Sequence, residues 1–257
     1  MSLIKINNIN INVNITGEGK PLIFIHGIGG DQTHLDTIIQ PLSKHFKTIA
    51  LDCRGHGLSD KPAEYTLQDH VQDVLGILAY YKLSSVNLFG VSMGSYIAQA
   101  VAIAAPERIE KLVLTVPKSN GLTSSVQRLF SEHSSEIEGK NLHEATLTLL
   151  RYFTYDADVM KQHINIFETD LPREQFAAAN KALAGFDFRK DLAKVTAQTL
   201  VISGKYDGLN PPEEGREVAA LIPDATFVEM QYSGHAPMFE EPEHYLKTVS
   251  DFLLSPL

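Results

Sequence analysis

The stretch LFGVSMGSYIAQA, residues 88–100, places one serine between two glycines where an apolar run ends and an alanine-rich segment begins. Glycine weakens both strands and helices, so Gly90 and Gly94 on either side of Ser92 need a local reason. A direct turn from a strand into a helix supplies one, because residues two positions away must be small for the two elements to approach. Such a turn exposes the Ser92 hydroxyl and aims the Met93 N–H at the same point. The stretch therefore predicts a nucleophile at a strand end, although a tight turn with an incidental serine has the same pattern.

The segments around this turn alternate between apolar strands and helices. Strands are predicted at residues 9–15, 21–27, 46–52, 84–91, 111–116, 198–204 and 225–230, and helices at 66–81, 95–107, 211–222 and 242–254. Buried strands that alternate with helices predict an α/β fold with a mostly parallel central sheet covered on both faces. Residues 118–191 contain only helical spacing. The sequence thus predicts a core domain of residues 1–117 and 192–257, interrupted by an all-helical cap at 118–191.

A serine hydroxyl needs a base, and that base needs a carboxylate to orient it. His235 follows the strand ATFVEM, and Asp207 follows the strand QTLVISG, so both are expected at the same edge of the sheet as Ser92. The order Ser92, Asp207, His235 is the one expected for a nucleophile on such a turn. Taken singly, Asp207 also suits a turn before Gly208, and His235 also suits a solvated loop.

The negative charge of a tetrahedral intermediate needs two N–H donors. Met93 offers one, and the loop HGIGG, residues 26–30, is placed to offer the second, for which Ile28 is the candidate. Gly27 lets the backbone approach a ligand there. His26 is predicted to support this loop rather than to bind a metal, because no partner ligand lies at metal-site spacing.

The bulk composition indicates a soluble globular protein. The 257-residue chain has a formal net charge of −9 and no basic stretch, which argues against a nucleic-acid partner. The N-terminus lacks an apolar signal-peptide core, and no run approaches the roughly 20 apolar residues of a membrane span. A single cysteine, Cys53, excludes an intramolecular disulfide and suits a reducing compartment, so a cytoplasmic location is expected. The sequence does not indicate an oligomeric state.

Five motifs together resemble the α/β-hydrolase fold: HGIGG, DCRGHGLSD (52–60), GVSMGS, ISGKYD and SGHAPMFEEPE. The resemblance implies the nucleophile Ser92, the acid Asp207, the base His235 and the oxyanion-hole amides of Ile28 and Met93. It also implies a helical cap that roofs the pocket. For Asp52, Arg54, Gly55 and Gly57 of the motif DCRGHGLSD, the resemblance implies structural roles.

Within that superfamily the chain looks most similar to small carboxylesterases and 3-oxoadipate enol-lactonases. Two features depart from the lactonases: Ser95 stands where a glycine is usual, and the chain has no tryptophan. The expected activity is hydrolysis of a small-molecule ester or lactone through an acyl-enzyme, with no metal or cofactor. Perhydrolysis, C–C bond hydrolysis and thioester hydrolysis use the same triad and stay open. A small-molecule receptor that retains the triad is the alternative of another class.

Aromatic and apolar side chains of the cap are candidates for the pocket lining, although helical spacing of this kind is more typical of packing. They are Phe130, Leu149, Tyr152, Phe153, Phe167 and Phe176.

Overall fold

One eight-stranded sheet forms the centre of the molecule, with the strand order β1-β2-β4-β3-β5-β6-β7-β8. The computed structural model describes residues 2–164 and 171–256. The strands β3 to β8 are parallel, whereas β1 and β2 run antiparallel at one edge, so the predicted mostly parallel sheet is confirmed. The strands are β1 (Ser2–Ile6), β2 (Ile9–Thr16), β3 (Lys20–Ile25), β4 (Phe46–Leu51), β5 (Val86–Val91), β6 (Ile109–Thr115), β7 (Gln198–Gly204) and β8 (Ala225–Met230).

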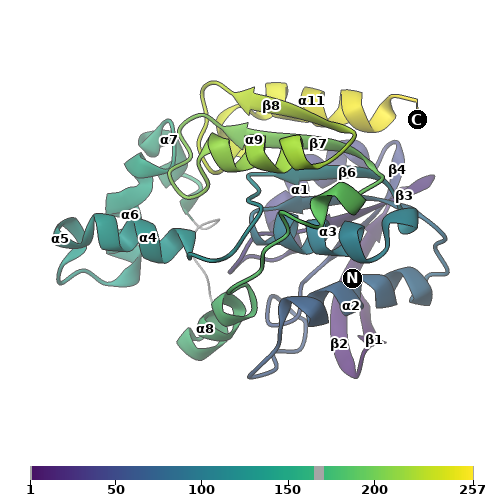
Figure 1. Cartoon of the computed structure of the whole chain (residues 1–257). Coiled ribbons are helices and arrows are strands. Elements are labelled where there is room, and N and C mark those ends of the chain that lie inside the picture. Colours follow the sequence, from purple (N-terminus) through teal and green to yellow (C-terminus); the bar gives the residue numbers. More distant parts are fainter. Residues whose placement is uncertain (1, 165–170, 257) are drawn as a thin grey trace.

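Helices cover both faces of this sheet (Figure 1). On one face pack α2 (Leu67–Tyr80), α3 (Met93–Ala104) and α9 (Pro212–Leu221), and on the other α1 (Asp36–Leu42) and α11 (Pro242–Leu254). The short helix α10 (Pro237–Glu240) precedes α11. Helix α2 begins at a capping box, in which Thr66 and Asp69 satisfy each other's backbone N–H groups.

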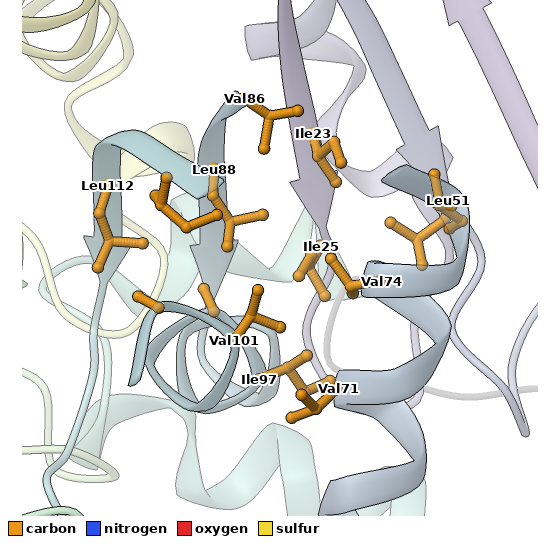
Figure 2. Close-up of a cluster of buried hydrophobic side chains, with 14 of the residues drawn as sticks. Ile23, Ile25, Leu51, Val71, Val74, Val86, Leu88, Ile97, Val101 and Leu112 are labelled. Atoms are coloured by element: carbon orange, nitrogen blue, oxygen red, sulfur yellow. The ribbon is translucent and has the colours of Figure 1, made fainter. Parts of the chain in front are cut away.

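The apolar strand runs are explained by burial on both faces. Figure 2 shows the core on the face that α2 and α3 cover, where Ile25 of β3 lies near Val74 of α2. Val101 of α3 points toward the sheet, and Ile97 lies beside Val71 of α2. The side chain of Phe24, which alternates with Ile25, points to the opposite face, where its ring centroid lies 5.0 Å from that of Phe89.

Two elements of the first half were not predicted from the sequence. The strand β1 pairs with β2 through a hairpin whose two turn residues, Asn7 and Asn8, have positive φ angles of 48° and 66°. Helix α1 has Pro41 near its end, and that residue conceals the helical pattern.

The chain between β6 and β7 holds the helices α4 to α8, which lie together beyond one end of the sheet (Figure 1). Their bounds are α4 (Ser125–Glu132), α5 (Ser134–Ile137), α6 (Leu142–Leu149), α7 (Ala157–Lys161) and α8 (Arg173–Ala182). Within the described part of 118–191 there is no strand, only an isolated bridge between Asn120 and Asp187. The helical insertion is therefore confirmed, whereas the limits of a separate cap domain stay a prediction. None of the helices in the described ranges is both long and apolar enough to cross a bilayer.

Candidate active site

Ser92 lies on the turn from β5 into α3, in a strained backbone conformation with φ 52° and ψ −116°. The two glycines permit this turn. A Cβ on Gly94 would lie 2.1 Å from the backbone oxygen of Ile25, and one on Gly90 would lie 2.2 Å from that of Gly94. Ser95 donates a hydrogen bond of 2.6 Å from its hydroxyl to the carbonyl of Ser92, so the residue that departs from the lactonase pattern steadies the same turn.

The structure brings Ser92, His235 and Asp207 together in one hydrogen-bonded chain. The Ser92 Oγ lies 3.1 Å from Nε2 of His235, and Nδ1 of His235 lies 2.7 Å from Oδ2 of Asp207. The Asp207 side chain is fully buried, and its Oδ1 accepts the N–H groups of Leu209 and Asn210, each at 2.9 Å. Because an ionised carboxylate only accepts, Nδ1 carries the proton and Nε2 is free to accept the serine proton.

Two backbone N–H groups next to Ser92 are available to a ligand. Ile28 and Met93 both line the cavity described below, and no described group accepts a hydrogen bond from either N–H. The Gly27–Ile28 peptide passes close to the nucleophile, since a Cβ on Gly27 would lie 3.7 Å from the Ser92 Cβ. These positions suit donors to an oxyanion on a substrate attacked by Ser92.

His26 supports the loop of residues 26–30 through hydrogen bonds of both its ring nitrogens. It is fully buried, its Nε2 accepts the N–H of Cys53 at 3.0 Å, and its Nδ1–H therefore donates to the carbonyl of Gly27 at 2.7 Å. Burial lowers the pKa of His26 to about 4, so the ring is neutral at pH 7. Because both ring nitrogens are engaged, neither is free for a metal. The bond to Gly27 fixes the peptide that carries the Ile28 N–H.

The loop DCRGHGLSD stabilises the fold around this site. Asp52 accepts the backbone N–H groups of Gln32 and Leu58 and the side-chain amide of Asn12. Arg54 makes a bidentate ion pair with Asp73 of α2 at 2.6 and 2.7 Å. Two glycines of the loop, Gly55 and Gly57, have positive φ angles. None of the four loop residues singled out from the sequence lines the cavity.

A cavity of about 720 Å³ opens over Ser92, between the carboxyl ends of the strands and the helices α4, α6 and α8. Its described lining is mostly apolar and includes three of the six predicted side chains, Phe130, Phe153 and Phe176. Leu149 is instead buried in the core, and Tyr152 stacks on His133 with ring centroids 3.6 Å apart. Phe167 lies outside the described residues.

Two residues of the site were not predicted from the sequence. The Asn210 amide donates to the hydroxyl of Tyr96 and to the carbonyl of Val116, both at 2.7 Å. Because the Tyr96 oxygen accepts this bond, its own proton is free to face Ser92 or a ligand. Burial raises the pKa of Tyr96, so the hydroxyl stays protonated. The signal was available, since Tyr96 follows Ser92 by one helical turn and Asn210 follows Asp207 by three residues.

Glu240 fastens the loop that carries the base. Its Oε2 accepts the N–H of Gly234 at 2.7 Å, and its Oε1 accepts the N–H groups of Tyr155 and Asp156 at 2.7 and 3.0 Å. The N–H of His235 itself donates to the carbonyl of Phe153 at 2.7 Å. The histidine loop and the segment after α6 are therefore held together by the Glu240 carboxylate and by one bond between backbone groups.

We expect Glu240→Gln to lower the free energy of unfolding by about 1–3 kcal/mol, because the new amide NH₂ would face the Gly234 N–H with no acceptor. Activity should fall with it, since Gly234 adjoins His235. Urea unfolding and ester kinetics measure both effects. The control is Glu243→Gln, an exposed residue of α11. Equal stability of the two variants would show that the three bonds at Glu240 do not hold the loop.

Comparisons with known proteins agree with this geometry. A family model described as alpha/beta hydrolase fold matches residues 20–139. The chain is 28% identical to a pimeloyl-[acyl-carrier protein] methyl ester esterase from Aliivibrio salmonicida, over 92% of this chain and 93% of the relative. It is 25% identical to a 3-oxoadipate enol-lactonase from Acinetobacter baylyi, over 96% and 93%. The crystal structure of the enol-lactonase from Burkholderia xenovorans LB400 superposes with a TM-score of 0.85 and 26% identity, over 99% of this chain and all of that one. The chain thus has the α/β-hydrolase fold, and over more than nine-tenths of its length it is similar to an esterase and to enol-lactonases.

Proposed function

We propose that this protein cleaves a carboxylic ester or lactone of a small molecule through an acyl-enzyme on Ser92. The observation that carries the proposal is the chain of hydrogen bonds from Asp207 through His235 to Ser92, which ends in an apolar cavity. An ester-cleaving relative and two lactonase relatives support this choice of bond.

In the first half-reaction the Ser92 oxygen attacks the substrate carbonyl while its proton passes to Nε2 of His235. The bond to Asp207 stabilises the resulting imidazolium. The carbonyl oxygen becomes an oxyanion that accepts the N–H groups of Ile28 and Met93. When the tetrahedral intermediate collapses, the proton on Nε2 passes to the leaving alkoxide, which departs as an alcohol.

In the second half-reaction a water molecule takes the place of the alcohol. His235 accepts its proton, the hydroxide attacks the acyl-enzyme, and collapse of the second intermediate returns the proton to Ser92. A lactone follows the same steps, except that the leaving alcohol stays attached to the acyl group. No step needs a metal or a cofactor.

A fluorophosphonate tests the nucleophile directly. We expect it to label one site, identified as Ser92 by peptide mass spectrometry, and hydrolysis of p-nitrophenyl esters from acetate to octanoate to disappear in proportion to labelling. The Ser92→Ala variant should take up no label. Hydrolysis that survives complete labelling, or a label on another serine, contradicts the assignment. If the protein neither hydrolyses these esters nor takes up the label, a function as a small-molecule receptor would be favoured.

A further inference from the structure

The cavity over Ser92 has two lysines and no aspartate or glutamate among its described lining residues. This is unexpected for a chain with a formal net charge of −9. One of the lysines, Lys181, is largely exposed, and its ammonium pairs with Glu64 at 2.9 Å. The other, Lys118, is only 7% exposed, and no described carboxylate lies within ion-pair distance of it.

The described partners of the Lys118 ammonium are neutral. Its Nζ donates to the carbonyl of Thr123 at 2.7 Å and to the hydroxyl of Ser125 at 3.2 Å. An ammonium has three protons, and the third meets no acceptor among the described residues. Lysine is seldom buried without a counter-charge, because desolvation of the cation is then uncompensated. Glu214 acts on Lys118 from a distance without lining the cavity, and burial, the larger effect, lowers the lysine pKa.

The side chain of Tyr96 lies near both this cation and the nucleophile. The Nζ of Lys118 lies 5.9 Å from the ring centroid of Tyr96, and Tyr96 follows Ser92 by one turn of α3. The hydroxyl of the same tyrosine interacts with the Ser92 side chain. Ser92, Tyr96 and Lys118 all line the same cavity, so one small ligand can contact both the nucleophile and the ammonium.

We propose that Lys118 binds a carboxylate of the substrate, so that the natural substrate is an ester or lactone that carries an acid group a few bonds from the scissile carbonyl. This inference rests on the proposed function. Binding of the carboxylate would supply the counter-charge that the described part of the protein lacks, through a charge-assisted hydrogen bond.

Matched pairs of substrates test the proposal. Mono-p-nitrophenyl glutarate and p-nitrophenyl valerate differ by a carboxylate on the acyl group, and 3-carboxyphenyl valerate and phenyl valerate differ by one on the leaving group. We expect kcat/KM to favour the acid-bearing member of one pair by about 10- to 100-fold, the range for a hydrogen bond to a charged group. The responding pair shows which part of the substrate carries the acid.

Lys118→Met should abolish this preference and leave the neutral ester within threefold of the parent, whereas Lys118→Arg should keep part of it. Lys190→Met, which removes an exposed charge, is the control for long-range electrostatics. The proposal is overturned if the parent enzyme does not prefer either acid, or if Lys118→Met slows both members of a pair equally, which would mean that Lys118 only holds the loop at Thr123 and Ser125.

Calorimetric titration with glutarate separates this inference from the proposed function. If no ester is hydrolysed and Ser92 is not labelled, the proposed function fails, yet glutarate binding that Lys118→Met abolishes would still support the carboxylate site. Absence of glutarate binding to the parent, together with equal turnover of both members of each pair, would leave the site without support and refute it.

Discussion

The Asp207→Asn variant is expected to lose about 10⁴-fold in kcat on esters while its fold stays intact. The reason lies in which oxygen is engaged. Oδ1 accepts two backbone N–H groups, from Leu209 and Asn210, so the oxygen of an asparagine would occupy that position. Its NH₂ would then face Nδ1 of His235, which would have to accept rather than donate. The proton would move to Nε2, and the ring could no longer take the proton of Ser92.

Steady-state kinetics on p-nitrophenyl esters give kcat, and circular dichroism verifies the fold. The matched control is Asp224→Asn, an exposed aspartate, which should leave kcat unchanged. A loss of less than tenfold at Asp207 would show that another group orients His235.

Acid is expected to unfold the protein over the range from about pH 6.5 to about pH 4. Burial lowers the pKa of His26 to about 4 and that of His56 to about 3, from an ordinary value of 6.5, and it lowers the pKa of His70 as well. Between pH 6.5 and the lowered pKa values of the folded protein, the unfolded chain binds more protons than the folded one. The free energy of unfolding is therefore highest above about pH 6.5 and falls as the pH decreases. His26 alone accounts for about 3 kcal/mol at pH 4.

Urea unfolding at a series of pH values measures this loss. Because three histidines stay neutral in the folded state, the free energy of unfolding should change by about 4 kcal/mol per pH unit near pH 5.5. The variant His56→Gln should reduce this slope by about 1.4 kcal/mol per pH unit. The exposed His45 supplies the control variant, His45→Gln, with an unchanged slope. A stability that is flat from pH 6.5 to pH 5 would mean that these histidines are already charged in the folded protein.

The sequence was most informative where one residue type permits only one local geometry. The glycines around Ser92 required a strand-to-helix turn, and the non-alternating strands required a sheet covered on both faces. The hairpin of β1 and β2 was also encoded, in the pair Asn7 and Asn8, because asparagine tolerates the left-handed conformation that such turns need.

The remaining features depend on contacts between distant residues. In the sequence Lys118 is a lysine in a loop after β6, with nothing to distinguish it. It is buried because in the folded chain it packs beside Tyr96. Glu240 lies at the end of α10, next to the last helix of the chain. Its carboxylate nevertheless accepts the N–H groups of Tyr155 and Asp156, which precede it by 85 and 84 positions. Such pairings leave no periodic pattern, so no local rule identifies them.

The insertion of α4 to α8 between adjacent strands has a consequence for synthesis of the protein. A nascent chain that ends after α8 already contains Ser92, Ile28 and Met93, but it lacks both Asp207 and His235. The edge of β6 is then unpaired, because its neighbour β7 has not been made. The serine hydroxyl should therefore stay unreactive on the ribosome, and addition of the last two strands would both protect that edge and activate the nucleophile.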